Sequence, residues 1–492
     1  MNNWMLAVGL GLCLNATAFG QTVPVGTTNP YPTKATLLWQ TNLDASTTLP
    51  PVTITTPVGP DGTVYAFQFQ GGEISALNPD MSLKWGEAME LELVSSVAVA
   101  TDGSLIVPGA INGAGDSLYS LNPTNGAVNW AINFSDSFNT TFFSPPAIGP
   151  DGTIYIIYGN YAPAGYFPAL LAITNGVIAW TNVITTSTYD QENAPSIGPD
   201  GTIYFIDSEN NVNAVNPDGS ARWTDPQEYV SGASDTSPVI GLDGTVYVTT
   251  DVGQFVALEP DGVITWCYSL SDTNDFSFVG APEIGPDGTI YCEVDALATG
   301  DTNYIYALNP DGTLKWTFPI APTPLEDASY AKASACAIAS EGEIFVTDTG
   351  GNVYSLAPNG TQNWAYQTAS TGLLPPMIGP EGHVYVASYD DNNLYCFAGR
   401  PVACGVWPQF RRNARQTGAV ATAGVSGPVS QTNGFQVTLS GAPHMPVCAY
   451  ASSDLASWTN LGQVLLPATG TTNYLDKGAG RDPHRFYRAF PQ

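Results

Sequence analysis

Short runs of alternating apolar and polar residues, each bounded by a tight-turn signal, recur along most of the chain. In the unit 194–223, four such runs are separated by turns at 199–201, 210–211 and 217–219. Alternation with a period of two predicts β-strands, and Pro-Asp-Gly favours a hairpin because Pro presets φ and Gly accepts a positive φ. The unit therefore predicts a sheet of four short antiparallel strands.

This unit is repeated eight times. The phrase Gly-Pro-Asp-Gly-Thr-Val/Ile-Tyr recurs, exactly or in degenerate form, at 59–65, 149–155, 198–204, 241–247 and 285–291 and from Thr101, Ser340 and Pro380. A second phrase, in which an apolar run and a turn lead to tryptophan, also occurs eight times, at Trp39, Trp85, Trp130, Trp180, Trp223, Trp266, Trp316 and Trp364. A lone four-stranded sheet cannot bury both of its faces, whereas eight sheets stacked radially can. We therefore expect an all-β fold, an eight-bladed β-propeller in which each tryptophan fills the wedge between two blades.

The two ends of this array predict how the ring closes. Residues 35–39 form a fourth-strand phrase with no three strands before it, and 377–397 supplies three strands with no tryptophan phrase in register. We expect the N-terminal strand to complete the last blade, because this pairing removes the free sheet edges.

The repeat resembles the pyrroloquinoline-quinone-type propeller repeat, over about 35–399. The resemblance is carried by Ser-Pro-x-Ile-Gly-x-Asp-Gly-Thr-Val-Tyr at 237–247 and by Ala-Leu-x-Pro-Asp-Gly-x-x-x-Trp at 257–266. Proteins with this repeat are of two kinds. Quinoprotein dehydrogenases bind the quinone and calcium, whereas assembly-factor and scaffold proteins bind neither.

The sequence departs from the dehydrogenase kind. No two cysteines are adjacent, no insertion carries an acidic calcium cluster, and the haem-attachment motif Cys-x-x-Cys-His is missing. The resemblance therefore implies a non-catalytic binding or scaffold protein without a cofactor. The alternative is an oxidoreductase that depends on the quinone (PQQ) and calcium.

Charge narrows the range of partners. Only 11% of the residues are charged and the net charge is −30, with 40 acidic and five basic residues in 1–399. Such a body repels phosphate, so nucleic acid and anionic membrane surfaces are poor partners, and we expect no nucleic-acid partner. A protein or polysaccharide partner, bound by a monomer, is the expectation that remains.

The N-terminus predicts export. An apolar run at 5–14 precedes small residues at Ala16, Ala18 and Gly20, so we expect a signal peptide over 1–20. No later apolar run reaches the roughly 18 residues that a membrane span needs. We expect a secreted, periplasmic or cell-surface protein. Export permits disulfides, and the shortest loop among the later cysteines joins Cys396 to Cys404, the candidate bridge.

Candidate binding residues lie just ahead of the first strand of each unit, where the connections are expected to ring one mouth of the central channel. Rigid blades make such loops suitable for recognition, since acidic side chains can gather a cation and a rare base can hold an anion. Solvated loop residues with no binding role are the alternative. No acid–base pair can be placed from the sequence, so no catalytic residue is assigned and an enzymatic activity stays open. The candidates are Glu192, Asn193, Asp235, Asp275 and Lys332.

Two further segments follow the last unit. The segment 400–427 predicts an arginine-containing clasp and linker, in which two aromatic residues anchor in a groove and three arginines pair with the acidic body. A basic patch for a partner is the alternative. The residues of the clasp are Trp407, Phe410, Arg411, Arg412 and Arg415.

Residues 428–492 predict a small β-sandwich-like accessory domain. The phrase at 451–462 and the ending Arg-Phe-Tyr-Arg-Ala at 485–489 resemble a C-terminal β-domain that is appended to many secreted bacterial proteins. Sorting, surface attachment and ligand contact all stay open as its role.

Overall fold

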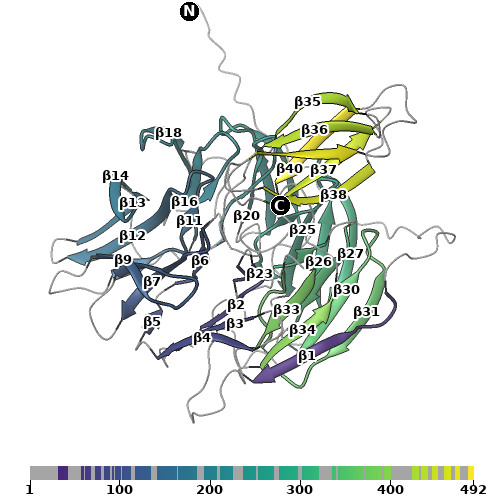
Figure 1. The fold of residues 1–492 in the computed structure, drawn as a ribbon, viewed down its shortest axis with the longest axis horizontal. Helices are drawn as coiled ribbons and strands as arrows, with labels where there is room; N and C mark the ends of the chain where they lie inside the picture. The colour runs from purple at the N-terminus through teal and green to yellow at the C-terminus, as the bar shows by residue number, and fades with distance from the viewer. Residues whose placement is uncertain are drawn as a thin grey trace, which may run out of the picture.

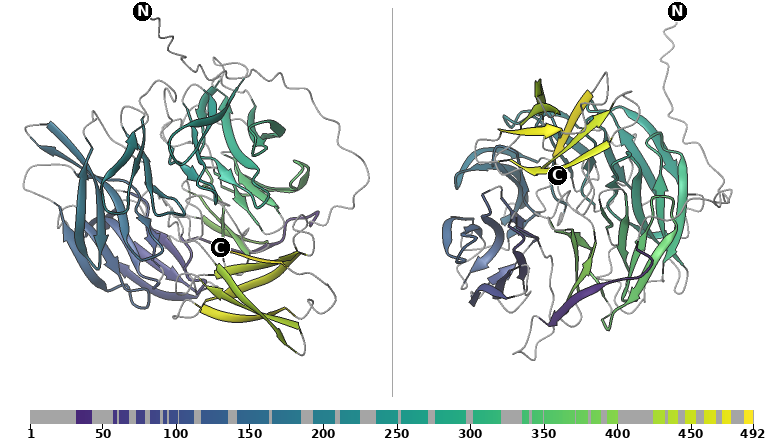
Figure 2. Two further views of the ribbon diagram at one scale, coloured as in Figure 1. Left: turned by 90° about the horizontal axis from the view of Figure 1, so that it is seen from above. Right: turned by 45° about the vertical axis from the view of Figure 1, so that its right-hand side comes forward.

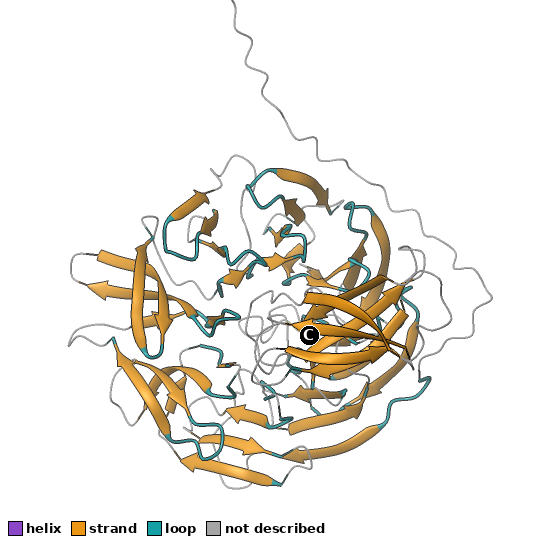
Figure 3. Ribbon diagram, turned by 45° about the horizontal axis from the view of Figure 1, so that its top comes forward, coloured by secondary structure: helices purple, strands orange, loops and turns teal. Residues whose placement is uncertain are grey.

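Eight small antiparallel sheets surround a central axis, and two further sheets lie outside this ring (Figure 3). The structure is a computed structural model that describes 32–42, then 57–399 and 424–491 with internal gaps, the longest being 185–192, 225–235, 321–334 and 477–485. All regular secondary structure in the described part of the chain is β-strand. None of the described residues forms a helix able to cross a bilayer. The predicted signal peptide, 1–20, lies outside the described residues.

The first four blades occupy 58–224. Blade 1 contains β2 (Val64–Phe67), β3 (Glu73–Leu77) and β4 (Leu83–Ala88), and Val58 bridges Val64. Blade 2 contains β5 (Leu91–Leu93), β6 (Ala98–Val99), β7 (Leu105–Ile111), β8 (Ser117–Leu121) and β9 (Val128–Asn133). Blade 3 contains β10 (Thr141–Phe143), β11 (Ala147–Ile148), β12 (Ile154–Ala162), β13 (Gly165–Thr174) and β14 (Val177–Val183). Blade 4 contains β15 (Ser196–Ile197), β16 (Ile203–Ile206), β17 (Val212–Val215) and β18 (Ala221–Thr224).

The other four blades complete the ring. Blade 5 contains β19 (Val239–Ile240), β20 (Val246–Thr249), β21 (Gln254–Leu258) and β22 (Ile264–Ser269). Blade 6 contains β23 (Phe276–Val279), β24 (Glu283–Ile284), β25 (Ile290–Ala296), β26 (Asn303–Leu308) and β27 (Leu314–Ile320). Blade 7 contains β28 (Ala337–Ile338), β29 (Ile344–Thr347), β30 (Asn352–Leu356) and β31 (Gln362–Gln367). Blade 8 contains β32 (Met377–Ile378), β33 (His383–Ala387), β34 (Asn393–Ala398) and β1 (Leu37–Asn42).

Blades 2–8 each have a two-residue inner strand followed by a turn that contains glycine, and in blade 1 the bridge of Val58 to Val64 takes the place of this strand. In blade 4 the amide of Gly201, at φ 84°, donates to the carbonyl of Gly198. Asp200 accepts a hydrogen bond from the amide of Thr202 at 3.0 Å, which fixes the turn from its side chain. Inner strands of successive blades contact one another, β11 with β15 and β15 with β19, so they lie nearest the axis.

The core of the ring lies between the blades. One buried cluster includes Ile206 of blade 4, Val248 of blade 5 and Ile290 of blade 6, so apolar contact passes from blade to blade. Since each sheet packs on both neighbours, apolar positions occur on both of its faces.

The tryptophans bind each blade to the next. Trp223 packs beside Tyr204 of its own blade, with ring centroids 5.9 Å apart, and its Nε1 donates to the carbonyl of Pro260 in blade 5 at 2.9 Å. The following Gly262 lies against the indole face. The same bond to the next blade is made at 2.9–3.0 Å by Trp85, Trp180, Trp266 and Trp316.

The ring is closed by the N-terminal strand. β1 pairs antiparallel with β34, with Leu37 opposite Phe397 and Trp39 opposite Cys396. Figure 1 shows β1 beside β34, although the two strands come from opposite ends of the propeller sequence. The predicted eight-bladed ring and its closure are confirmed.

The C-terminal residues form two three-stranded sheets with a core of their own. One sheet orders β35 (Gly424–Gln431), β36 (Gly434–Ser440) and β39 (Thr471–Asp476), and the other orders β38 (Thr459–Leu465), β37 (Pro446–Ser452) and β40 (Phe486–Pro491). Their shared core contains Val437, Leu439, Val447, Ala449 and Leu466. Figure 2 shows these strands as a unit outside the ring. The arrangement agrees with a small sandwich, except that β35 begins inside the segment expected to be linker.

Candidate functional site

The antiparallel order of strands gives the ring two different faces. The turns from first to second strand and from third to fourth strand lie at one end, which we call the turn face. The connections between blades and between second and third strands lie at the other end, the loop face. The two faces differ in chemistry, and this difference locates the candidate site.

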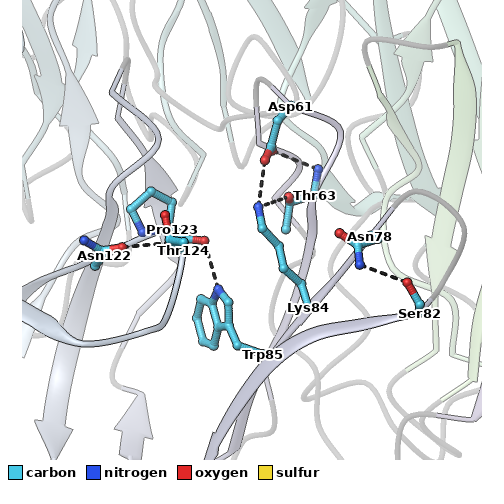
Figure 4. Close-up of polar contacts among 9 residues, drawn as sticks. All are labelled: Asp61, Thr63, Asn78, Ser82, Lys84, Trp85, Asn122, Pro123 and Thr124. Carbon is cyan, nitrogen blue, oxygen red and sulfur yellow. Dashed lines mark hydrogen bonds and ion pairs between the residues drawn. The ribbon is translucent and has the colours of Figure 1, made fainter.

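The turn face uses its charges to hold the turns. In blade 1 the Nζ of Lys84 lies 2.7 Å from Asp61 and donates to the hydroxyl of Thr63 at 2.8 Å (Figure 4). Asp61 also accepts the amide of Thr63. Burial raises the pKa of Asp61, but the bonds from Lys84 and Thr63 outweigh it and hold that pKa below its ordinary value. Figure 4 also shows Trp85 reaching Pro123 of the next blade.

The same arrangement recurs in blades 4 and 6. Arg222 lies 2.6 Å from Asp200, and Lys315 lies 2.9 Å from Asp287. These bases stand directly before a tryptophan, and each also contacts a threonine of the turn. Three of the five bases in 1–399 are therefore committed to structure.

The loop face begins with a set of small polar residues that we call the polar collar. They stand three residues ahead of the inner strand in four consecutive blades, and all are buried: Ser95, Ser144, Asn193 and Thr236. The hydroxyl of Ser144 accepts the amide of Ile157 at 2.9 Å, and that of Thr236 lies 2.9 Å from the hydroxyl of Thr249. Asn193, 3% exposed, has a side-chain carbonyl that accepts no hydrogen bond from the described part of the chain.

In the blade that follows the collar, blade 6, two carboxyl groups are buried. Glu283 on β24 and Glu293 on β25 are almost fully buried, and both act electrostatically on Cys336 of blade 7. We call these three residues the acidic seam. Sequence reasoning missed them. The available signal was the Pro-x-Ile-Gly phrase at 282–285, in which x is Glu where other units have small or apolar residues.

The structure describes one of the five candidate mouth residues. Asn193 belongs to the polar collar, while Glu192, Asp235, Asp275 and Lys332 lie outside the described residues. Within the described ranges, no set of three His, Cys, Asp or Glu side chains is arranged to hold a metal ion.

The clasp and the candidate disulfide are not tested. All five clasp residues lie outside the described residues: Trp407, Phe410, Arg411, Arg412 and Arg415. Cys396 is buried in β34, and its candidate partner Cys404 also lies outside them. The bridge stays a prediction.

Known structures share the ring. The chain is similar to BamB from Moraxella catarrhalis, at 17% identity and a TM-score of 0.50, with 74% of this chain and 97% of that chain covered. It is also similar to the C-terminal WD40 domain of Sif2, at 10% identity and a TM-score of 0.51, with coverages of 75% and 99%. At such identities the likeness shows the fold alone. No curated protein matches the chain.

A family model gives the more specific result. The model described as PQQ_2, outer membrane protein assembly factor BamB, matches at 61–241, 208–371 and 301–426. These matches span most of the propeller and agree with the resemblance read from the repeat phrases. The chain belongs to the PQQ_2 family of the outer membrane protein assembly factor BamB.

Proposed function

We propose that this chain is a non-catalytic binding or scaffold protein of the extracytoplasmic space, which engages a protein partner through its loop face. A ring sealed by β1 and cross-linked by tryptophan bonds holds the loop-face connections in fixed positions. Such rigidity reduces the entropy lost on binding. The family assignment and the expected signal peptide support the location.

The observation that carries this proposal is the extension of three blades at the loop face. β5, β10 and β23 come from interblade connections and pair with the far halves of β7, β12 and β25. Each continues the line of its inner strand, and in the described sheets each has a partner on one side only. An edge of this kind offers backbone donors and acceptors to an extended segment of another protein.

A photo-crosslinking experiment tests this proposal. A photoreactive amino acid replaces Thr141 on β10, and the matched control replaces Asn125 in a turn-face turn. After expression in a bacterial envelope, the photoreactive residue at 141 should form one adduct with a protein, and the residue at 125 should form none. A second substitution in the same chain, Phe142→Pro, disrupts the β10 edge and should abolish the adduct at 141. Adducts with polysaccharide, or equal adducts at both positions, would refute a protein partner at this face.

The second candidate is the quinone-dependent oxidoreductase. The quinone carries carboxylates that need cationic partners, and Lys84, Arg222 and Lys315 are held in ion pairs at the turn face. This favours the binding role. Addition of PQQ and calcium followed by an absorbance titration decides between them, because saturation near one equivalent would replace the scaffold proposal.

A further inference from the structure

Glu283 occupies an unusual position for a carboxyl group. It is the first residue of an inner strand, and none of its solvent-accessible surface is exposed. Among the described residues, neither of its carboxyl oxygens has a hydrogen-bond partner. No other described inner strand begins with a charged residue, since the equivalent positions hold Ala98, Ala147, Ser196, Val239, Ala337 and Met377.

A second carboxyl group lies on the same face of blade 6. Glu283 pairs with Tyr291 on β25, and Glu293 follows two residues later, so the two glutamates are diagonal neighbours. The equivalent residues of blades 5 and 7 are Thr249 and Thr347, whose hydroxyls contact a carbonyl of the following blade. Blade 6 thus places an acid where its neighbours place a hydroxyl.

The opposite side of the seam belongs to blade 7. Cys336 precedes β28, is buried, and packs in one cluster with Tyr291 and Ile338. The titratable groups that face Glu283 in the described part are therefore Glu293 and Tyr291 from blade 6 and Cys336 from blade 7. The ion pairs found among the described residues lie elsewhere, at the turn face.

Burial decides the protonation of this group. An ionised carboxylate without water or donors is strongly disfavoured relative to the neutral acid. Accordingly, burial raises the pKa of Glu283 well above its ordinary value. Burial likewise raises the pKa of the Cys336 thiol, and the negative charges that Glu283 and Glu293 carry when ionised raise it further.

We propose that the seam between blades 6 and 7 is a proton-operated latch, closed while Glu283 carries its proton and opened when that proton is lost. Ionisation would draw the carboxylate toward water and separate β24 and β25 from Cys336. Because the seam lies where the inner strand enters from the loop face, opening would change the spacing of the connections of blades 6 and 7. This inference does not depend on the identity of any partner.

The direction of the pH effect follows from linkage. A glutamate in the open, hydrated state has a pKa near the ordinary 4.5, whereas the closed state holds its proton to higher pH. At a pH between the pKa of Glu283 in the open state and its higher pKa in the closed state, closing of the seam therefore takes up a proton. The ratio of closed to open seams should fall by up to about tenfold per pH unit across this window and be constant below it.

Site-resolved thiol labelling measures this ratio. N-ethylmaleimide modification of Cys336 is followed by mass spectrometry from pH 5.5 to 8.5, in the wild-type chain and in Glu283→Gln. At each pH, the labelling rate of the wild type is divided by that of Glu283→Gln, which removes the effect of pH on the reactivity of an exposed thiol. This ratio should rise with pH by up to about tenfold per unit in favour of the wild type. Exposed Glu259→Gln is the matched control for the change of charge and should behave as the wild type.

Cys292 serves as an internal control. It is next to Glu293 on β25, on the opposite face of the strand, and its thiol donates to the carbonyl of Gly280 at 2.9 Å. Its labelling ratio should not depend on pH. Amide hydrogen exchange of the wild-type segment 283–296 gives a second readout. As the pH rises, exchange in this segment should accelerate more than the intrinsic exchange rate of an unprotected amide does.

Three results would overturn the latch. A labelling ratio for Cys336 that is constant with pH would show that Glu283 does not control opening. Absence of labelling in both proteins at every pH would show that the seam does not open. Faster labelling on addition of EDTA would show that a cation, and not a proton, compensates the buried carboxyl groups.

Discussion

At the scale of single residues, the ring depends on how closely an indole and a glycine approach each other. Trp223 covers the turn of the next blade, and Gly262 in that turn adopts φ 90°. A Cβ added to Gly262 would lie 3.1 Å from the Trp223 ring, so glycine is required for both its backbone conformation and its lack of a side chain.

Replacement of Gly262 by Ala should therefore weaken the contact between blades 4 and 5. We expect the free energy of unfolding to fall by about 1–3 kcal/mol, because a positive φ is strained in alanine and the methyl group contacts the indole. Urea unfolding followed by tryptophan fluorescence measures the change. Gly86→Ala is the control, since Gly86 has no positive φ and its Cβ would make only ordinary contacts, 3.7 Å from the Leu83 side chain and 4.0 Å from the carbonyl of Ile74. Equal effects of both changes would contradict the proposed role of Gly262.

At the scale of elements, the closing strand joins the two ends of the propeller sequence. β1 supplies the outermost strand of blade 8, and its removal would expose the edge of β34. An unpaired edge loses its hydrogen bonds and becomes a template for association with another chain. The stability of the whole ring should thus respond to a segment of only 11 described residues, 32–42.

A chain that lacks residues 1–42 should melt about 5–10 °C below the full propeller and associate at high concentration. Differential scanning fluorimetry measures the midpoint, and light scattering measures association. A synthetic peptide of 32–42 should restore the midpoint in a concentration-dependent way, because a ligand that binds only the folded state stabilises it. A scrambled peptide is the control. An unchanged midpoint after truncation would show that the ring does not rely on β1.

At the scale of the whole molecule, the propeller and the C-terminal sandwich have separate hydrophobic cores. The buried apolar residues of the sandwich form one cluster, which contains no residue of the ring. Separate cores are expected to unfold as separate cooperative units.

Removal of 424–492 should therefore leave the melting midpoint of the propeller unchanged within about 2 °C, the shift that roughly 1 kcal/mol produces in a large domain. Scanning calorimetry of the full chain should show an additional transition that the shortened chain lacks. A large drop in the propeller midpoint would reveal that the sandwich, or the strand β35 that starts it, supports the ring.

The sequence predicted the ring better than the site. Each repeat phrase specifies a local structure, because residues such as Asp200 and Gly201 favour a tight turn. Eight such phrases, with a single fourth strand at 35–39 that lacks its own first three strands, predict a closed ring. The acidic seam depends instead on which faces of blades 6 and 7 meet. Glu283 lies in an otherwise ordinary repeat phrase, and the phrase alone does not show that its side chain is fully buried between two blades.

The pairing of Leu37 with Phe397 also has a consequence for synthesis. β1, the first strand of the propeller to be synthesised, can pair only after β34, the last strand, has been made, whereas β34 already pairs with β33. A nascent chain therefore carries an unfinished blade until residue 397 has emerged. A product that stops before β34 would leave β1 without its partner strand and blade 8 incomplete.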